Sequence, residues 1–287
     1  APFLAAYHKP VLCLSPEKSE LRNIITDERC IANMHDVTEI KQKLKASAFH
    51  LGISIFVVGL ILTAIIFFWY PSPFLIISGL FNIILMLILI DVVLGPLLTF
   101  IVFKKGKSSL KFDLFAIAVV QVLALSYGIY IIYQAHPLYI AYAVDRFTPI
   151  DTSEVSPAMA RYDEFKKSKL SQPTIVYVKK PSDPAELSKV TIEALSGGAD
   201  LDARPEYYEP IIKNTDEIFK NSFNLNKLLE KEEYKIKINN FLNKHGGTVK
   251  DYAFIPLVGR QEDVLWAWSL KTKNPIDILH INPFTSS

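Results

Sequence analysis

Residues 74–103 read FLIISGLFNIILMLILIDVVLGPLLTFIVF, and this stretch decides the fold. Asp91 is its single charged side chain. A helix rises about 1.5 Å per residue, and about 20 apolar residues cross the hydrocarbon core of a bilayer, so the stretch is longer than one crossing needs. It therefore predicts a transmembrane helix that tilts or bends, with the bend at Gly95-Pro96.

Two more apolar runs flank this stretch. The run over residues 48–70 carries no charge apart from His50 at its start, and Pro71-Ser72-Pro73 separates it from the next helix. The run over residues 113–133 ends in tyrosines, which are typical of a membrane interface. We predict three transmembrane α-helices, about 48–70, 74–103 and 113–133, in a membrane domain of residues 46–136, followed by a C-terminal soluble α+β domain over residues 144–287.

The lysines predict how these helices cross the membrane. Four of them crowd the loop between the second and third helices, which we call the lysine-rich loop, and none lies in the turn between the first two; they are Lys104, Lys105, Lys107 and Lys111. Loops rich in Lys and Arg stay in the cytoplasm. The N-terminus is then cytoplasmic, and an odd number of crossings places the C-terminal domain on the opposite side.

Residues 1–45 are expected to be a cytoplasmic tail. They contain no apolar core of 7 to 15 residues after a basic start, so they do not resemble a cleavable signal peptide. Met34 is a natural start for the rest of the chain, and the sequence opens on Ala, so we treat residues 1–33 as a segment that need not be native.

The C-terminal domain shows local signals of both helix and strand. Residues 174–178 are β-branched and predict a strand, and residues 184–195 predict a helix capped by Asp183 and ended by Gly197-Gly198. Residues 214–244 predict one or two helices. Residues 252–258, 264–270 and 276–281 predict a three-stranded meander, in which Trp266 and Trp268 share one face.

Composition and motifs exclude several classes of function. Positive and negative charges nearly balance at a net +2, so nothing predicts nucleic-acid binding. Cys13 and Cys30 form no metal or redox motif, and the histidines have no ligand partner at a useful spacing. The sequence contains no nucleophile motif, phosphate loop or dinucleotide fingerprint. We expect no catalytic residue, no cofactor and no metal.

Asp91 needs an explanation, because a carboxylate inside a bilayer costs about 3 kcal/mol on insertion scales. Its distance from the lysine-rich loop is comparable with that of Gln121 and Tyr127 on the next helix, so these side chains can meet. The structural interpretation is a protonated Asp91 that hydrogen-bonds Gln121, Tyr127 or Thr63 and holds the helices together. The functional interpretations are a proton or ion relay, or a polar socket for another transmembrane helix. We favour the structural role, because Asp91 stands alone in mid-membrane and a relay needs several groups in series.

Two other sites are singled out by charge. Asp113 follows Lys111 at the start of the third helix, where the helix dipole favours a carboxylate and the nearby lysines can pair with it. Asp145-Arg146 lies at the junction with the C-terminal domain. The run Lys166-Lys167-Ser168-Lys169 is interpreted as a solvated face, with binding of an acidic patch as the lesser alternative.

Several motifs together resemble the TfpX/TfpZ family of type IV pilin accessory proteins. They are residues 91–99, 109–114, 121, 127–128, 144–147, 256–260 and 281–284. The resemblance runs from about Lys45 to the end of the chain. It departs from the family at His136, Asn282 and Phe284, where arginine, aspartate and tryptophan are usual.

The resemblance implies a non-enzymatic protein of the bacterial inner membrane, with a periplasmic C-terminal domain, that helps a type IV pilin assemble or retract. The implied partners are the type IV major pilin, other pilus assembly machinery and membrane lipid. We expect the polar and packing residues Asp91, Gly95, Pro96, Gln121 and Tyr127 to lie where the pilin helix is contacted. The alternatives are a proton-linked transporter or membrane enzyme that uses Asp91, and, less favoured, a sensor.

Overall fold

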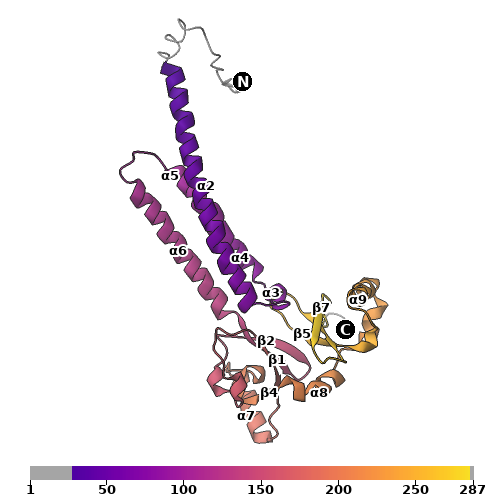
Figure 1. The fold of residues 1–287 in the computed structure, drawn as a ribbon. Coiled ribbons are helices and arrows are strands. Elements are labelled where there is room, and N and C mark those ends of the chain that lie inside the picture. Colours follow the sequence, from indigo (N-terminus) through magenta and orange to yellow (C-terminus); the bar gives the residue numbers. More distant parts are fainter. Residues whose placement is uncertain (1–27, 285–287) are drawn as a thin grey trace, which may run out of the picture. The chain divides into compact units, whose positions relative to one another are not determined.

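The computed structural model describes the backbone of residues 28–284, and the side chains of residues 36–284 other than 226 and 227 (Figure 1). Three helical segments are long and apolar enough to cross a membrane: Asp36–Phe68, Phe81–Val102 and Leu110–Gln134. A mixed sheet with several helices follows them. The predicted fold class is therefore confirmed. Residues 1–27 of the predicted tail lie outside the described residues.

The first membrane helix is longer than the apolar run that predicts it. Helix α2 covers Glu28–Phe68, whereas hydropathy marks its start near residue 48. The preceding residues are rich in Glu, Lys and Gln, which favour helix but not lipid, so a hydropathy pattern does not register them. Pro71 follows the end of the helix, as expected for a residue that cannot continue it.

The stretch 74–103 is divided into several helical pieces instead of one bent helix. They are α3 (Phe74–Ile77), α4 (Phe81–Ile88), the π-helix η1 (Leu89–Leu94) and α5 (Gly95–Val102). Gly79, at φ +71°, separates α3 from α4 in a conformation that favours glycine. Helix α6 (Leu110–Gln134) is the third membrane helix.

The chain divides into two compact units. Among the described residues, the first holds 28–55 together with Ile90–Val122, and the second holds Phe56–Leu89 together with 123–284. In the second unit, Gly128 of α6 lies against Leu87 of α4 so closely that a β-carbon there would overlap the Leu87 side chain. This glycine lets two membrane helices approach each other, as small residues commonly do in lipid.

The C-terminal domain is built on a seven-stranded sheet with the order β4-β3-β1-β2-β5-β6-β7. The strands are β1 (Pro137–Ala143), β2 (Arg146–Asp151), β3 (Thr174–Val178), β4 (Tyr208–Pro210), β5 (Tyr252–Leu257), β6 (Val264–Ser269) and β7 (Pro275–Leu279). Strands β1 and β2 form an antiparallel hairpin in the middle, and β1 pairs with β3 in parallel. The predicted meander is confirmed as β5-β6-β7.

Helices and turns complete the domain. Helix α7 (Pro184–Leu195) has the predicted cap, since the Asp183 carboxylate accepts the Ala185 N–H at 3.1 Å. The predicted helical region 214–244 becomes α8 (Thr215–Lys220), the 3-10 helix η7 (Leu225–Glu230) and α9 (Glu232–His245). The remaining described 3-10 turns are η2 (Pro157–Met159), η3 (Asp163–Phe165), η4 (Leu201–Ala203), η5 (Pro205–Tyr207), η6 (Ile211–Lys213) and η8 (Val249–Asp251).

Apolar side chains bury both faces of the strands β5 and β6. Trp266 and Trp268 pack on one face with Phe147 and Ile255, as their spacing predicts, and Leu265 packs on the other face under α9. Helix α3 joins the first of these cores, because its Phe74 ring meets Trp266 edge-on with centroids 5.8 Å apart. The short helix α3, which lies between α2 and α4 in the chain, is thus part of the core of the C-terminal domain.

Candidate functional site

The π-helix in the second membrane segment leaves the main-chain carbonyl of Asp91 without its π-type donor. A π-helix bonds each carbonyl to the N–H five residues on. For Asp91 that residue is Pro96, which has no N–H to donate. The Asp91 carbonyl instead accepts a hydrogen bond from Gln121 Nε2 of α6 at 3.1 Å. A side chain of the neighbouring helix therefore replaces the missing main-chain donor, which lipid cannot supply.

The same amide also contacts the Asp91 side chain. Gln121 Nε2 lies 3.4 Å from Asp91 Oδ1. Gly95 makes this possible, because a β-carbon at position 95 would overlap the Gln121 amide. Asp91, Gly95 and Pro96 are all buried. The π-helix that contains Asp91 thus widens the helix. Pro96 removes a main-chain donor, and Gly95 leaves the space that the Gln121 side chain fills.

Two further polar contacts join α2 to α5 in the same unit. Ser47 Oγ donates to the Pro96 carbonyl at 2.8 Å, and His50 Nδ1 lies 2.6 Å from Thr99 Oγ1. Nothing in the sequence pointed to either pair, because Ser47 and Thr99 are small polar residues of a kind common in membrane helices. We call Ser47, His50, Asp91, Thr99 and Gln121 the membrane polar cluster.

Asp91 keeps one hydrogen-bonding position unused. The residue is only 4% exposed, and Oδ2 has no hydrogen-bond partner among the described residues. An ionised carboxylate accepts several hydrogen bonds, whereas a protonated one also donates one. The cluster can therefore take one more polar group, or exchange a proton, at this oxygen.

Two other residues predicted to meet Asp91 have different surroundings. The Tyr127 ring is 68% exposed on the surface of α6. Thr63 donates to the Gly59 carbonyl of its own helix at 2.7 Å. Of the three predicted neighbours, Gln121 is the one that hydrogen-bonds Asp91 within the described part of the chain.

The lysine-rich loop is exposed and holds Asp113 at the start of α6. Lys107 Nζ lies 2.6 Å from Asp113 Oδ2, and Ser109 Oγ donates to the same oxygen at 3.1 Å. The predicted pairing of Asp113 with a nearby lysine is confirmed. The other lysines of the loop are exposed; they are Lys104, Lys105 and Lys111.

The predicted junction pair lies at the tip of the β1–β2 hairpin. Arg146 Nε is 2.7 Å from Asp145 Oδ1, and the Arg146 guanidinium lies 4.8 Å from the centre of the Phe284 ring. Val144 beside them is 79% exposed and has φ +60°, which is strained for a β-branched residue. The hairpin tip is therefore an exposed, partly apolar surface feature.

A second buried aspartate, which the sequence did not reveal, lines a cleft between α3 and the sheet. Phe74 and Ile77 form its apolar wall, and Asp151 and Arg260 form an ion pair in it. Burial raises the pKa of Asp151 to about 7, although the positive charge of Arg260 acts in the opposite direction. The cleft has a volume of about 130 Å³.

Gly259 allows the turn between β5 and β6 to pack closely against α3 at this cleft. A β-carbon at Gly259 would lie 2.8 Å from the Ile77 carbonyl oxygen and closer still to the Glu262 carbonyl oxygen. Gln261, two residues further along the same turn, donates its main-chain N–H to that Ile77 carbonyl at 2.9 Å. The turn between β5 and β6 therefore fits against α3 only with glycine at this position.

In the described part of the chain, no three His, Cys, Asp or Glu side chains are grouped closely enough to hold a metal ion.

Comparison with known proteins points to fimbrial assembly. A model of the family described as "Fimbrial assembly protein FimB" matches residues 38–79. The fimbrial assembly protein of serogroup E1 from Dichelobacter nodosus is 29% identical over 226 residues, which cover 76% of this chain and 86% of that protein.

Two further relatives from the same organism match a shorter part. The fimbrial assembly protein of serogroups C1 and C2 is 34% identical over 113 residues, which are 39% of this chain and 86% of that protein. The serogroup I protein is also 34% identical over 113 residues, but these are 44% of its length, so the match spans less than half of it. No solved structure matches the chain.

Proposed function

This chain belongs to the fimbrial assembly protein family, and from that membership we propose that it is a non-enzymatic membrane factor for the assembly of a type IV pilus. The names of three relatives support the role in pilus assembly. Three helices capable of crossing a membrane support its place in a membrane. The narrower TfpX/TfpZ membership, indicated by the motifs of spans two and three, is part of the proposal.

The single observation that carries the mechanism is the Oδ2 atom of Asp91, which has no partner in the described part of the chain. In lipid a polar group without a partner is unfavourable, and interhelical hydrogen bonds contribute to helix association. Because this oxygen is buried, a helix with a polar side chain at the same depth would satisfy it only if the membrane helices move apart to admit that side chain. We infer that this helix is the apolar stem of the major pilin, which waits in the membrane before assembly.

The C-terminal domain would meet the other end of the same client. The lysine-rich loop favours a cytoplasmic N-terminus and a periplasmic C-terminal domain in the inner membrane. A pilin has its globular head on that side. The hairpin tip at Val144 and Asp145-Arg146 is an exposed candidate for contact with the head. Fusions of a periplasm-active reporter at position 287 and in the loop at Lys105 test the topology: only the first should be active.

Photocrosslinking in the bacterium tests the pilin contact. A photoreactive amino acid is placed at Leu94 or Leu98, which flank Gly95 and are 46% and 41% exposed, and at Val144 in the hairpin tip. Lys105 in the lysine-rich loop is the matched control. We expect pilin adducts from Leu94 or Leu98 and from Val144, and none from Lys105.

The outcome distinguishes this function from other roles. Adducts with other proteins but never with pilin would contradict the proposal. The second candidate function, a proton-linked transporter or enzyme, rests on the same oxygen of Asp91. It requires Asp91 to lose and regain a proton, so it predicts that Asp91→Asn is folded but inactive.

A further inference from the structure

The sheet of the C-terminal domain has a gap beside its β1–β2 hairpin. Within the described residues, strands β2 and β5 pair at the single position Phe147–Leu257, and the Val258 N–H donates to the Phe147 carbonyl at 2.9 Å. Beyond this point β2 continues to Asp151, whereas β5 ends at Leu257. Residues of β2, of the turn after β5 and of α3 line the cleft that contains Asp151 and Arg260. We call it the Arg260 cleft.

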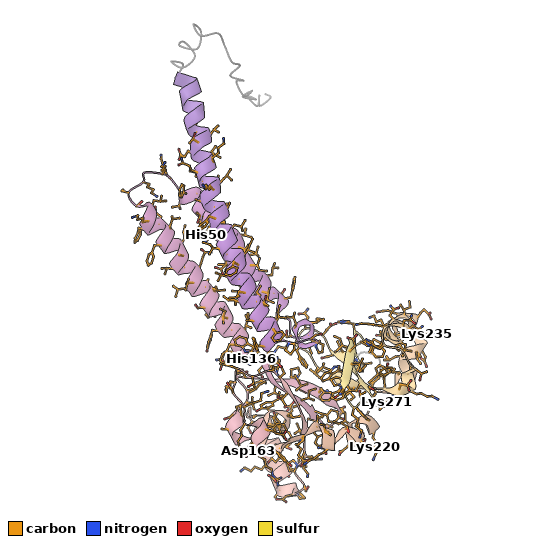
Figure 2. The ribbon with its side chains drawn as sticks, viewed as in Figure 1. His50, His136, Asp163, Lys220, Lys235 and Lys271 are labelled. Carbon is orange, nitrogen blue, oxygen red and sulfur yellow. The ribbon has the colours of Figure 1, made fainter. Side chains whose placement is uncertain are left out.

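The walls of the Arg260 cleft are largely apolar. All of its lining residues belong to the second compact unit. His136, which Figure 2 labels where α6 meets the C-terminal domain, lies in the chain between two of them. The apolar lining residues are Phe74, Ile77, Ala135, Pro137, Pro149 and Val258. An apolar cavity of about 150 Å³ in another protein accommodates one benzene molecule. The volume of about 130 Å³ therefore suits one compact apolar group.

Arg260 supplies a positive charge to this cleft, and part of its guanidinium group is unused. Nη2 contacts Asp151 Oδ2. Among the described residues, Nε and Nη1 of Arg260 donate no hydrogen bond. The Arg260 side chain is 57% exposed, whereas the Asp151 side chain is 6% exposed. A ligand in the cleft can therefore reach Arg260, while Asp151 holds the guanidinium group from the buried side.

The main chain on both sides of Arg260 is held in place. Gly259 donates its N–H to Asp263 Oδ1 at 3.2 Å, and Gln261 donates its N–H to the Ile77 carbonyl at 2.9 Å. A side chain that is already ordered loses little freedom when it binds a ligand. The planar guanidinium group presents its donors as a rigid fork that matches a carboxylate. The turn and Asp151 thus preorganise Arg260 for an anionic group.

The charge of Asp151 does not cancel that of Arg260 completely. Burial raises the pKa of Asp151 to about 7, so near neutral pH this carboxyl group is only partly ionised. The other acidic side chains of the turn are already engaged, because Glu262 pairs with His280 Nδ1 at 2.7 Å and Asp263 accepts a main-chain N–H. Arg260 therefore keeps part of its charge for a ligand, next to apolar walls.

We propose that the Arg260 cleft binds a carboxylate that carries one compact apolar group. The carboxylate accepts hydrogen bonds from Nε and Nη1 of Arg260, and the apolar group packs against Phe74, Ile77 and Val258. Asp151 is a positioning residue, because it acts on the ligand through Arg260. Two sources share this chemistry: a free short-chain carboxylic acid, and the apolar C-terminal residue of a partner protein. The inference does not depend on the pilus role.

Isothermal titration calorimetry on the purified full chain in lipid nanodiscs tests the proposal, with empty nanodiscs to subtract partition into lipid. Isocaproate represents the free acid, and the peptide acetyl-Gly-Gly-Leu, with a free C-terminal carboxylate, represents a partner chain. Each probe has a matched neutral amide. We expect the carboxylates to bind at least about tenfold more tightly than the amides, because they gain charge-assisted hydrogen bonds. The carboxylate that binds more tightly identifies the source.

Variants of the chain separate charge from fit. Arg260→Gln should weaken carboxylate binding at least about tenfold and leave amide binding unchanged. Arg260→Lys makes the same test if that variant does not fold, because lysine lacks the fork. Arg161→Gln removes an exposed arginine of the same domain and should change neither affinity. Ala135→Leu fills the cleft and should weaken both forms; Val258→Phe replaces it if it does not fold.

The positioning role of Asp151 has its own readout. Asp151→Ala should weaken carboxylate binding without affecting the amide, and Asp151→Asn, which still accepts a hydrogen bond, should restore it. Equal affinity for the carboxylate and amide forms, or carboxylate binding that survives both Arg260 variants, would overturn the proposal. So would the absence of saturable binding of either carboxylate up to about 10 mM.

Discussion

Asp91 and Asp151 are buried to the same extent, and the protein treats them in opposite ways. Each of these residues is 4% exposed. Asp91, in the membrane helices, has the neutral amide of Gln121 as its partner and one oxygen without any partner in the described residues. Asp151, in the sheet, forms an ion pair with Arg260, whose side chain is 57% exposed.

The difference follows from the surroundings. A cation inside the bilayer would carry its own insertion cost, so a carboxylate there is better matched by an amide. At the end of the central strand β2, Arg260 can reach Asp151 while keeping contact with water, which reduces its own desolvation. Asp91 is therefore a hydrogen-bonding group that can accept a further partner, whereas Asp151 is a charged group that holds part of the C-terminal domain together.

The largest effect is expected at Gly259, beside Asp151, and the matching substitution at Gly95, beside Asp91, should cost less. Gly259→Ala should cost about 2–3 kcal/mol of unfolding free energy, because its β-carbon meets main-chain oxygens of Ile77 and Glu262 that cannot move independently. Gly95→Ala should cost about 1 kcal/mol, because it meets only the end of the Gln121 side chain. Thermal unfolding in detergent measures both.

Gly59→Ala is the matched control, since a β-carbon at this position would meet no atom within 4 Å among the described residues beyond its chain neighbours and the backbone of its own helix. It should leave stability unchanged or raise it slightly, because alanine favours helix. Equal losses for Gly95→Ala and Gly259→Ala would contradict the distinction between a side-chain and a main-chain contact.

Removal of the cation at Asp151 should have the next largest effect. Arg260→Met leaves a buried carboxylate without its partner, and we expect a loss of about 2 kcal/mol at pH 8. At pH 5 the loss should be smaller, because Asp151 is then largely protonated. Lys271→Met, at an exposed position of the same domain, should change stability little at either pH. A loss at pH 5 as large as at pH 8 would contradict the ion-pair interpretation.

The intact protein should show a graded dependence on pH. The pKa of Asp151 is about 7 in the folded chain and about 3.9 in an unfolded one. Between these values the folded state holds a proton that the unfolded state releases, so stability falls as pH rises from about 4 to 7 and then levels off. Asp151→Asn should flatten this part of the profile, and denaturant titrations from pH 4.5 to 8 measure it. An unchanged slope in the variant would assign the dependence to other groups.

Part of this architecture could be predicted because local chemistry decides it. The Asp183 cap and Gly197-Gly198 define α7 without help from the rest of the fold, and alternation places Trp266 and Trp268 on one face. The β1–β2 hairpin escaped prediction because residues 137–143 are apolar on both faces and continue the apolar run of α6. A central strand lacks the alternation that marks a half-buried one.

The membrane polar cluster could be predicted only in part. Two helices joined by a short loop bring residues at comparable depth together, which pointed to Gln121. Depth leaves the rotation of each helix undetermined, so it also suggested Tyr127. The π-helix adds a residue to the turn and changes that rotation, and its run of apolar residues carries no local mark of the change. The contact of Asp151 with Arg260 joins residues 109 positions apart and depends wholly on the sheet.

The contrast between the two aspartates holds only if Asp91 acts through hydrogen bonds and not by releasing a proton. The direct test is the number of surface pili in bacteria that carry Asp91→Asn or Asp91→Leu at matched protein levels. We predict that asparagine, which still offers an oxygen and an N–H, preserves piliation, while leucine abolishes it. A stable Asp91→Asn protein without pili would contradict this claim and favour proton chemistry.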